Sequence, residues 1–166
     1  MIGNTDAVAA RLSIPQPQSM QNTAGPRRRR AHSAISILFV DDRDNDALRI
    51  LSSLSACRDM QLAVDHVSDV TEASRLWDEG QHDLAMFDIW LGNGTSVALL
   101  TALAADAAAR PLVVLSNLPE CETRSLSAGC ADLMVHSKND LSSAALAMTV
   151  GSALALARHD AVRLDA

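Results

Sequence analysis

Five short apolar runs, separated by longer amphipathic segments, constrain the fold of this chain more than any other feature of its sequence. The runs are Ile35–Val40, Leu62–Val67, Leu84–Phe87, Leu112–Leu115 and Leu133–Val135. Most are rich in Val, Ile and Leu, and polar or turn-forming residues bound them. This pattern is typical of strands that are buried on both faces.

The segments between the runs have the spacing of helices. Apolar residues recur at helical intervals over 47–54, 73–77 and 97–103, and an Ala- and Leu-rich segment extends from about Leu141 to Arg158. Another segment opens at Pro119 and stops at Gly129, residues that favour a helix start and a helix end. This alternation predicts an α/β fold: a five-stranded parallel sheet with helices on both faces, doubly wound in the flavodoxin-like (βα)5 manner.

The first 34 residues differ from the rest of the chain. They contain Pro, Gly, Gln and Ser without apolar periodicity, together with the run Arg27–Arg30. The sequence therefore predicts a disordered basic arm over 1–34, one domain over 35–160 and a short tail over 161–166. Five arginines and one acid give residues 1–35 a charge of +4, whereas nine basic and nineteen acidic residues give the remainder −10. The arm suits contacts with nucleic acid or acidic lipid, and a leader without a specific role is the alternative that we favour.

Composition excludes several classes of function for the domain. The chain has no Tyr, two Phe and two Trp, too few for stacking platforms that bind single-stranded nucleic acid. An acidic domain also argues against binding of phosphate backbones, and no apolar run approaches the roughly twenty residues of a membrane-spanning helix. Three cysteines without C-x-x-C spacing indicate free thiols in a reducing compartment. We therefore expect a cytoplasmic protein whose domain binds neither nucleic acid nor membrane.

The residues that follow the predicted strands carry the chemistry. Asp41 and Asp42 follow the first run, Asp88 the third and Ser116 the fourth, and Lys138, the only lysine, lies within three residues of the fifth. Taken singly, the acids suit helix caps or turns, Ser116 a loop hydroxyl and Lys138 a surface charge. Because ligands of open α/β sheets bind at the carboxyl ends of the strands, the shared placement of these residues favours one common site.

A cluster of this composition suits phosphoryl transfer. Close carboxylates repel one another unless a cation joins them, and Mg²⁺ takes a few carboxylates while keeping several waters. A carboxylate beside the cation can attack phosphorus and form an aspartyl phosphate. The ammonium of Lys138 can then neutralise a second phosphoryl oxygen, and the hydroxyl of Ser116 can donate to a third.

These residues resemble a known family, the receiver domain of two-component response regulators, over about Ile35 to Arg158. The resemblance rests on Phe39–Asp42, Phe87–Leu91, Val114–Ser116 and the lysine after the fifth strand. Asp88 lies 46 residues after Asp42, Ser116 lies 28 residues after Asp88, and Lys138 lies 22 residues after Ser116. These spacings are similar to those of the family.

The resemblance implies a role for each residue of the cluster. Asp88 would be the phospho-acceptor. Asp42 and Asp88 would ligate Mg²⁺ together with the backbone carbonyl of Trp90, and Asp41 would assist through water. Ser116 takes the place of the switch Ser/Thr, and Lys138 takes that of the phosphate-binding lysine.

The resemblance also implies signalling rather than enzymatic turnover. A single-domain response regulator catalyses its own phosphorylation from a histidine kinase or a histidine phosphotransfer protein, then docks a downstream protein or continues a phosphorelay. The chain ends soon after the fifth predicted helix, so we expect no output domain, and that helix is a candidate surface for a partner or a homodimer. Four residues depart from the family pattern. Val135 replaces a usual aromatic, Gly92 and Asn139 stand where proline is common, and Asn117 stands where a small residue is common.

Two other functions are compatible with parts of this pattern. One is a receiver-like interaction module that is never phosphorylated, which the missing aromatic at Val135 favours. The other is a phosphatase of the haloacid-dehalogenase type, which Asp42–Asp44, Val114–Asn117 and Lys138 faintly resemble. The phosphatase would need an acidic pair at a further strand end after the lysine and gives Asp88 no role, so we rank it last.

Overall fold

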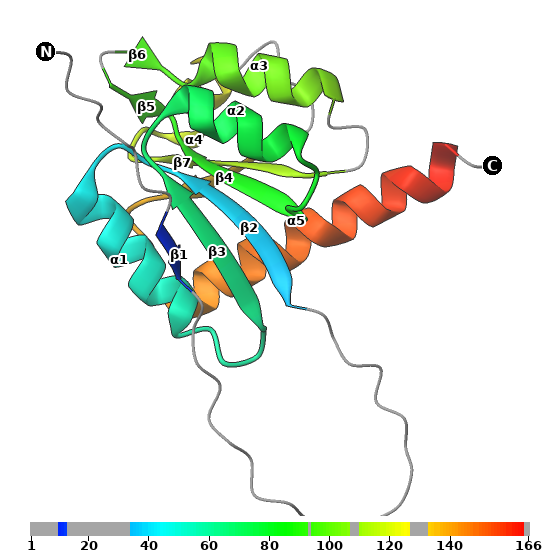
Figure 1. Ribbon diagram of the computed structural model, residues 1–166, viewed down its shortest axis with the longest axis horizontal. Coiled ribbons are helices and arrows are strands. Elements are labelled where there is room, and N and C mark those ends of the chain that lie inside the picture. Colours follow the sequence, from blue (N-terminus) through cyan, green and yellow to red (C-terminus); the bar gives the residue numbers. More distant parts are fainter. Residues whose placement is uncertain (1–9, 13–33, 93, 107–109, 127–132, 165–166) are drawn as a thin grey trace, which may run out of the picture.

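The computed structural model describes residues 10–12, 34–92, 94–106, 110–126 and 133–164. One six-stranded sheet forms its centre, in the order β1-β3-β2-β4-β7-β8 (Figure 1). The strands of this sheet are β1 (Ala10–Leu12), β2 (Ile35–Val40), β3 (Leu62–Val67), β4 (Leu84–Asp88), β7 (Leu112–Ser116) and β8 (Met134–Ser137). The five strands from β2 onward pair in parallel, which confirms the predicted α/β fold.

The order of the strands fixes where a ligand can bind. β2 pairs with β3 on one side and with β4 on the other, so the chain winds outward in both directions from this central pair. The winding reverses between β2 and β4, and ligands of open α/β sheets bind outside the carboxyl ends of the strands at such a point. The fold therefore places the residues after Val40 and Phe87 beside each other.

Helices cover both faces of the sheet. On one face lie α1 (Asp44–Ser55) and α5 (Ser143–Leu164), and on the other lie α2 (Val70–Asp78) and α3 (Val97–Asp106) (Figure 1). A fifth helix, α4 (Glu120–Leu126), joins β7 to the segment before β8. Among the described residues, no helix is long and apolar enough to span a membrane.

Two apolar clusters separate the sheet from its helices. Alternate residues of a strand point to opposite faces, so Ala85 and Phe87 of β4 join the cluster under α2 and α3, whereas Leu84 and Met86 join the cluster under α1 and α5. All four side chains are fully buried. Burial on both faces explains why these strands are continuous apolar runs rather than alternating ones.

The two ends of the chain differ from the expected division into arm, domain and tail. β1 lies inside the predicted disordered arm, and its three residues pair antiparallel with β3. An edge strand presents unpaired backbone N–H and C=O groups, and β1 satisfies part of that edge of β3. The last helix continues to Leu164, so the predicted tail over 161–166 is helical for most of its length. The rest of the arm (1–9 and 13–33) and the expected end of the fourth helix at Gly129 lie outside the described residues.

A pair of leucines on α1 tests the assignment of its buried face. Leu54 is 1% exposed in the cluster under α1 and α5, and Leu48 is 65% exposed on the same helix. Leu54→Ala leaves a cavity and should lower the free energy of unfolding by about 2–5 kcal/mol. Leu48→Ala should change it by no more than about 0.5 kcal/mol. Urea unfolding followed by circular dichroism measures both, and equal losses would contradict this orientation of α1.

Candidate functional site

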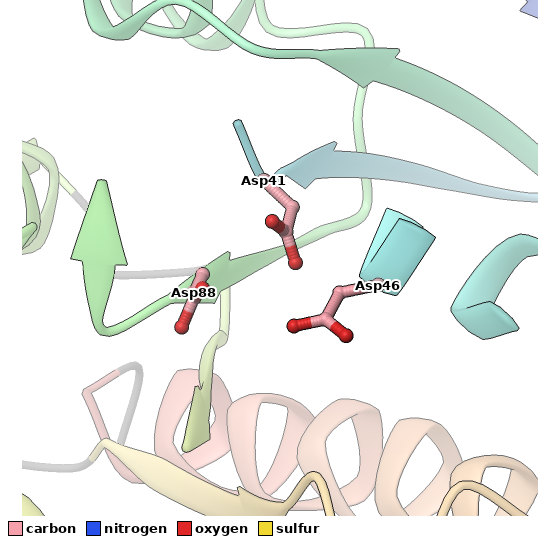
Figure 2. Close-up of side chains that lie close together, drawn as sticks. All are labelled: Asp41, Asp46 and Asp88. Carbon is pink, nitrogen blue, oxygen red and sulfur yellow. The ribbon is translucent and has the colours of Figure 1, made fainter. Parts of the chain in front are cut away.

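Three carboxylates meet at the carboxyl edge of the sheet. Asp41 follows β2 directly, Asp88 is the last residue of β4, and Asp46 belongs to the first turn of α1 (Figure 2). One oxygen of each lies within 4.8 Å of the others. Asp41 and Asp88 are nearly inaccessible to solvent, whereas Asp46 is partly exposed at the rim. Adjacent parallel strands bring the first two acids together, and the turn into α1 adds the third.

Lys138 joins the three carboxylates. Its Nζ donates hydrogen bonds to Asp88 Oδ2 at 2.8 Å, to Asp41 Oδ2 at 2.9 Å and to Asp46 Oδ2 at 3.3 Å. These bonds use all three ammonium donors, and the side chain is almost fully buried. The backbone N–H of Lys138 also donates to the carbonyl oxygen of Ser116 at 2.8 Å, which anchors the lysine to the end of β7.

Burial and charge act in opposite directions on this cluster. Burial raises the pKa of Asp88, and the nearby charge of Asp41 raises it further, against the effects of Lys138 and of the Trp90 N–H. Burial alone would lower the pKa of Lys138, but its hydrogen bonds to Asp88 and Asp41 outweigh this, and its pKa is raised. The lysine is therefore held as a cation, and burial disfavours the charged form of Asp88.

Asp42 lies beside this cluster rather than in it. Its Oδ2 accepts a hydrogen bond from the backbone N–H of Gly92 at 2.6 Å. Its Oδ1 is buried and has no hydrogen-bond partner among the described residues. The sequence predicts one common site for Asp41, Asp42 and Asp88. In the structure, the third acid of the group whose oxygens lie within 4.8 Å of one another is Asp46, not Asp42.

Asp88 is followed by a small hairpin that was not predicted. β5 (Trp90–Leu91) pairs antiparallel with β6 (Gly94–Thr95), and the N–H of Trp90 donates to Asp88 Oδ1 at 3.3 Å. The turn that is the alternative role for Asp88 includes Asn93, which lies outside the described residues. Trp90 itself is 39% exposed.

Ser116 is at the predicted position, but its hydroxyl is engaged elsewhere. The side chain is fully buried at the end of β7. Its Oγ is 2.9 Å from the hydroxyl of Thr123 on α4, and it accepts a hydrogen bond from the N–H of Leu118 at 3.0 Å. Val135, which replaces the usual aromatic, is half-buried on β8 opposite Val114. The serine is thus tied to the start of α4 rather than to the carboxylates.

Sequence reasoning missed Asp46, Thr123 and the donor of Gly92. Asp46 is the third residue of α1 and Thr123 is the fourth residue of α4, so neither lies at a strand end. Polar residues in the first turn of a helix are the signal that points to them. The capping alternative for Asp41 and Asp42 is wrong, because Arg43 is the N-cap of α1 and makes no side-chain cap. The Oδ1 of Asp41 accepts the Arg43 N–H at 2.9 Å instead.

The composition of this edge fits a bound divalent cation. Three carboxylates, of Asp41, Asp46 and Asp88, share one ammonium, and Asp42 lies beside them, so negative charge remains in excess. The buried, unpartnered Oδ1 of Asp42 is a hard oxygen donor without a proton donor to satisfy it. Mg²⁺ prefers such oxygen ligands and retains water in its remaining positions.

Solved structures similar to this chain include receiver domains. The signal receiver domain of an HD domain-containing protein from Pseudomonas fluorescens Pf-5 has a TM-score of 0.66 and 19% identity, covering 86% of this chain and 99% of that one. A CheY-like receiver domain protein from Methanospirillum hungatei JF-1 gives 0.64 and 19%, covering 77% and 99%. A response regulator receiver protein from Sinorhizobium medicae WSM419 gives 0.62 and 24%, covering 75% and 97%.

No protein-family model and no curated protein matches the chain. The similarity is therefore one of structure, and it shows that the chain has the fold of response regulator receiver domains. This confirms the fold that the resemblance in sequence implied.

We expect Asp88→Asn to stabilise the protein in the absence of divalent cations. Because the pKa of Asp88 is raised, the stability of the wild type falls as pH rises from the ordinary pKa of aspartate through the raised one. The neutral amide removes that loss and still accepts a hydrogen bond from Lys138. The melting temperature at pH 7 in EDTA should rise by roughly 2–6 °C, the size of a change of about 1 kcal/mol.

The exposed acid Asp44 provides the control, since Asp44→Asn should leave the melting temperature nearly unchanged. A lower melting temperature for Asp88→Asn would show that ionised Asp88 stabilises the fold, contrary to this account.

Proposed function

We propose that this protein is a phospho-acceptor receiver that takes a phosphoryl group onto Asp88. The observation that carries the proposal is the pairing of buried Asp88 with Lys138 at 2.8 Å, at the point where the winding of the sheet reverses. Ligands of open α/β sheets bind at this edge. Burial raises the pKa of Asp88, so added positive charge would stabilise its anionic form. The receiver fold of the chain supports the same function.

The reaction is a transfer of the phosphoryl group from a phosphorylated histidine. An oxygen of Asp88 forms a bond to phosphorus as the N–P bond breaks, and the electron pair of that bond returns to the imidazole. Lys138 stays within reach of the new phosphoryl group and neutralises part of its charge, because Asp41 and Asp46 hold the ammonium in place. The Oγ of Ser116 accepts hydrogen bonds from the Thr123 hydroxyl and the Leu118 N–H, so its own proton is left to donate to the group.

A divalent cation belongs to this proposal. Asp42, Asp88 and the backbone carbonyl of Trp90 would hold Mg²⁺, with Asp41 acting through water. The cation would supply neutralisation of a phosphoryl oxygen. Asp46 adds negative charge at the rim of the same site.

The partners follow from this chemistry. A histidine kinase or a histidine phosphotransfer protein would supply the phosphoryl group, and a downstream protein would bind the phosphorylated form or receive the group in a phosphorelay. We infer that the protein acts as a single-domain response regulator in the cytoplasm. It catalyses its own phosphorylation and is not an enzyme with turnover on an independent substrate.

Electrophoresis with a phosphate-binding gel tests the acceptor. The wild type, incubated with a phosphorylated histidine kinase and Mg²⁺, should give a retarded band that Asp88→Asn lacks. Absence of an Asp88-dependent band would overturn the proposal and leave the interaction module as the alternative. Steady hydrolysis of a generic phosphate ester would instead indicate the phosphatase.

Lys138→Gln separates binding of the cation from stabilisation of the phosphoryl group. We expect phosphorylation of Asp88 to slow by about a hundredfold, because a preorganised donor to the developing charge is lost. Affinity for Mg²⁺ should rise several-fold, since an ammonium no longer competes for Asp41 and Asp88. Lys138→Arg, which keeps the charge, should not raise the affinity. A weaker affinity in Lys138→Gln would contradict the competition that we describe.

A further inference from the structure

We propose that the backbone N–H of Gly92 positions Asp42 as a ligand for a divalent cation. The proposal rests on the cation site of the proposed function and deepens it, by naming a positioning residue outside the acidic cluster. It starts from the hydrogen bond between Gly92 N and Asp42 Oδ2, which spans 2.6 Å and joins residues fifty positions apart in the chain.

This hydrogen bond leaves one particular oxygen for the cation. A bond between an N–H and a charged carboxylate is roughly twice as strong as one between neutral groups, so it restricts rotation of the Asp42 side chain. With Oδ2 engaged, Oδ1 is the remaining acceptor, and it is buried without a partner in the described part of the chain. A buried carboxylate oxygen without a donor is costly, and a cation is the group that would satisfy it.

The hairpin that contains Gly92 is itself well anchored. β5 and β6 pair through Trp90 with Thr95 and through Leu91 with Gly94. After β6, the N–H of Ser96 donates to the carbonyl oxygen of Ile89 at 2.8 Å. The same hairpin holds Asp88 Oδ1 through the N–H of Trp90. One short hairpin therefore orients two carboxylates: that of Asp42, which follows β2, and that of Asp88, which ends β4.

The residue type at position 92 makes this bond available. Gly92 has a φ of 59°, in the left-handed region that glycine adopts without strain. The receiver domains that this chain resembles often have proline at this position, and proline has no N–H and a fixed negative φ. Gly92 thus supplies an N–H donor that a proline at this position would lack, and the N–H is directed at an acid of the site.

Mg²⁺ affinity, measured by isothermal titration calorimetry on the full chain, tests the proposal. Gly92→Pro removes the donor and should weaken Mg²⁺ binding by roughly 10–100-fold, the usual effect of losing a group that orients a metal ligand. Gly92→Asn is the conservative variant: it keeps the N–H, and Asn tolerates a positive φ better than most residues. A Cβ at this position meets no atom within 4 Å, so Gly92→Asn should bind within about twofold of the wild type.

A double-mutant cycle distinguishes positioning from general damage to the hairpin. If Gly92 acts through Asp42, then Gly92→Pro should cause no further loss of affinity in an Asp42→Asn background. Circular dichroism should show the same fold for each variant. Unchanged affinity in Gly92→Pro, or an equal loss in both backgrounds, would overturn the proposal.

The measurement also separates this inference from the proposed phosphorylation. A wild type that binds no Mg²⁺ would overturn the inference together with the cation site. Mg²⁺ binding that depends on Gly92 would support the inference even if no Asp88-dependent phosphorylated band forms.

Discussion

The burial of one ammonium among carboxylates is the interaction on which the site depends. Lys138 is 5% exposed and gives each of its three donors to a different acid, those of Asp41, Asp46 and Asp88. Charges at this depth are tolerated only when they are paired, and removing one partner leaves the other uncompensated. The ends of β2, β4 and β8 and the first turn of α1 must therefore meet in one arrangement. That arrangement leaves an excess of negative charge, which suits both a cation and a phosphoryl transfer.

The segments that follow the strands hold the acids in their orientations. A backbone N–H from the hairpin after β4 contacts Asp42 and another contacts Asp88, and Arg43 N–H contacts Asp41. On the other side, α4 holds Ser116 through Thr123. The sheet thus determines which residues share an edge, and the loops determine where each side chain points. This division is usual for sites built on a rigid scaffold.

Most of the fold was predictable because its signals are local and repeated. The runs over 35–40 and 62–67 are strands with those bounds, and the other three differ by one or two residues. β1 was not predictable, because three residues pair only when the edge of β3 is present to receive them. The pairing of Asp46 with Lys138 also depends on a distant partner, 92 residues away in the chain. Position after a strand end predicted Asp41, Asp88 and Lys138, whereas Asp46 lies in the first turn of a helix, to which that rule does not point.

The sequence by itself determined the alternation of strands and helices and the types of residue at the carboxyl edge, since periodicity and placement after strands are properties of the chain alone. Tertiary structure decided the contacts. It placed Asp42 on the N–H of Gly92 rather than within the close acidic group, brought Asp46 to Lys138 and turned Ser116 toward Thr123. The physical reason is that hydrogen bonds and ion pairs form between atoms within about 3 Å, a distance set by packing of the whole fold.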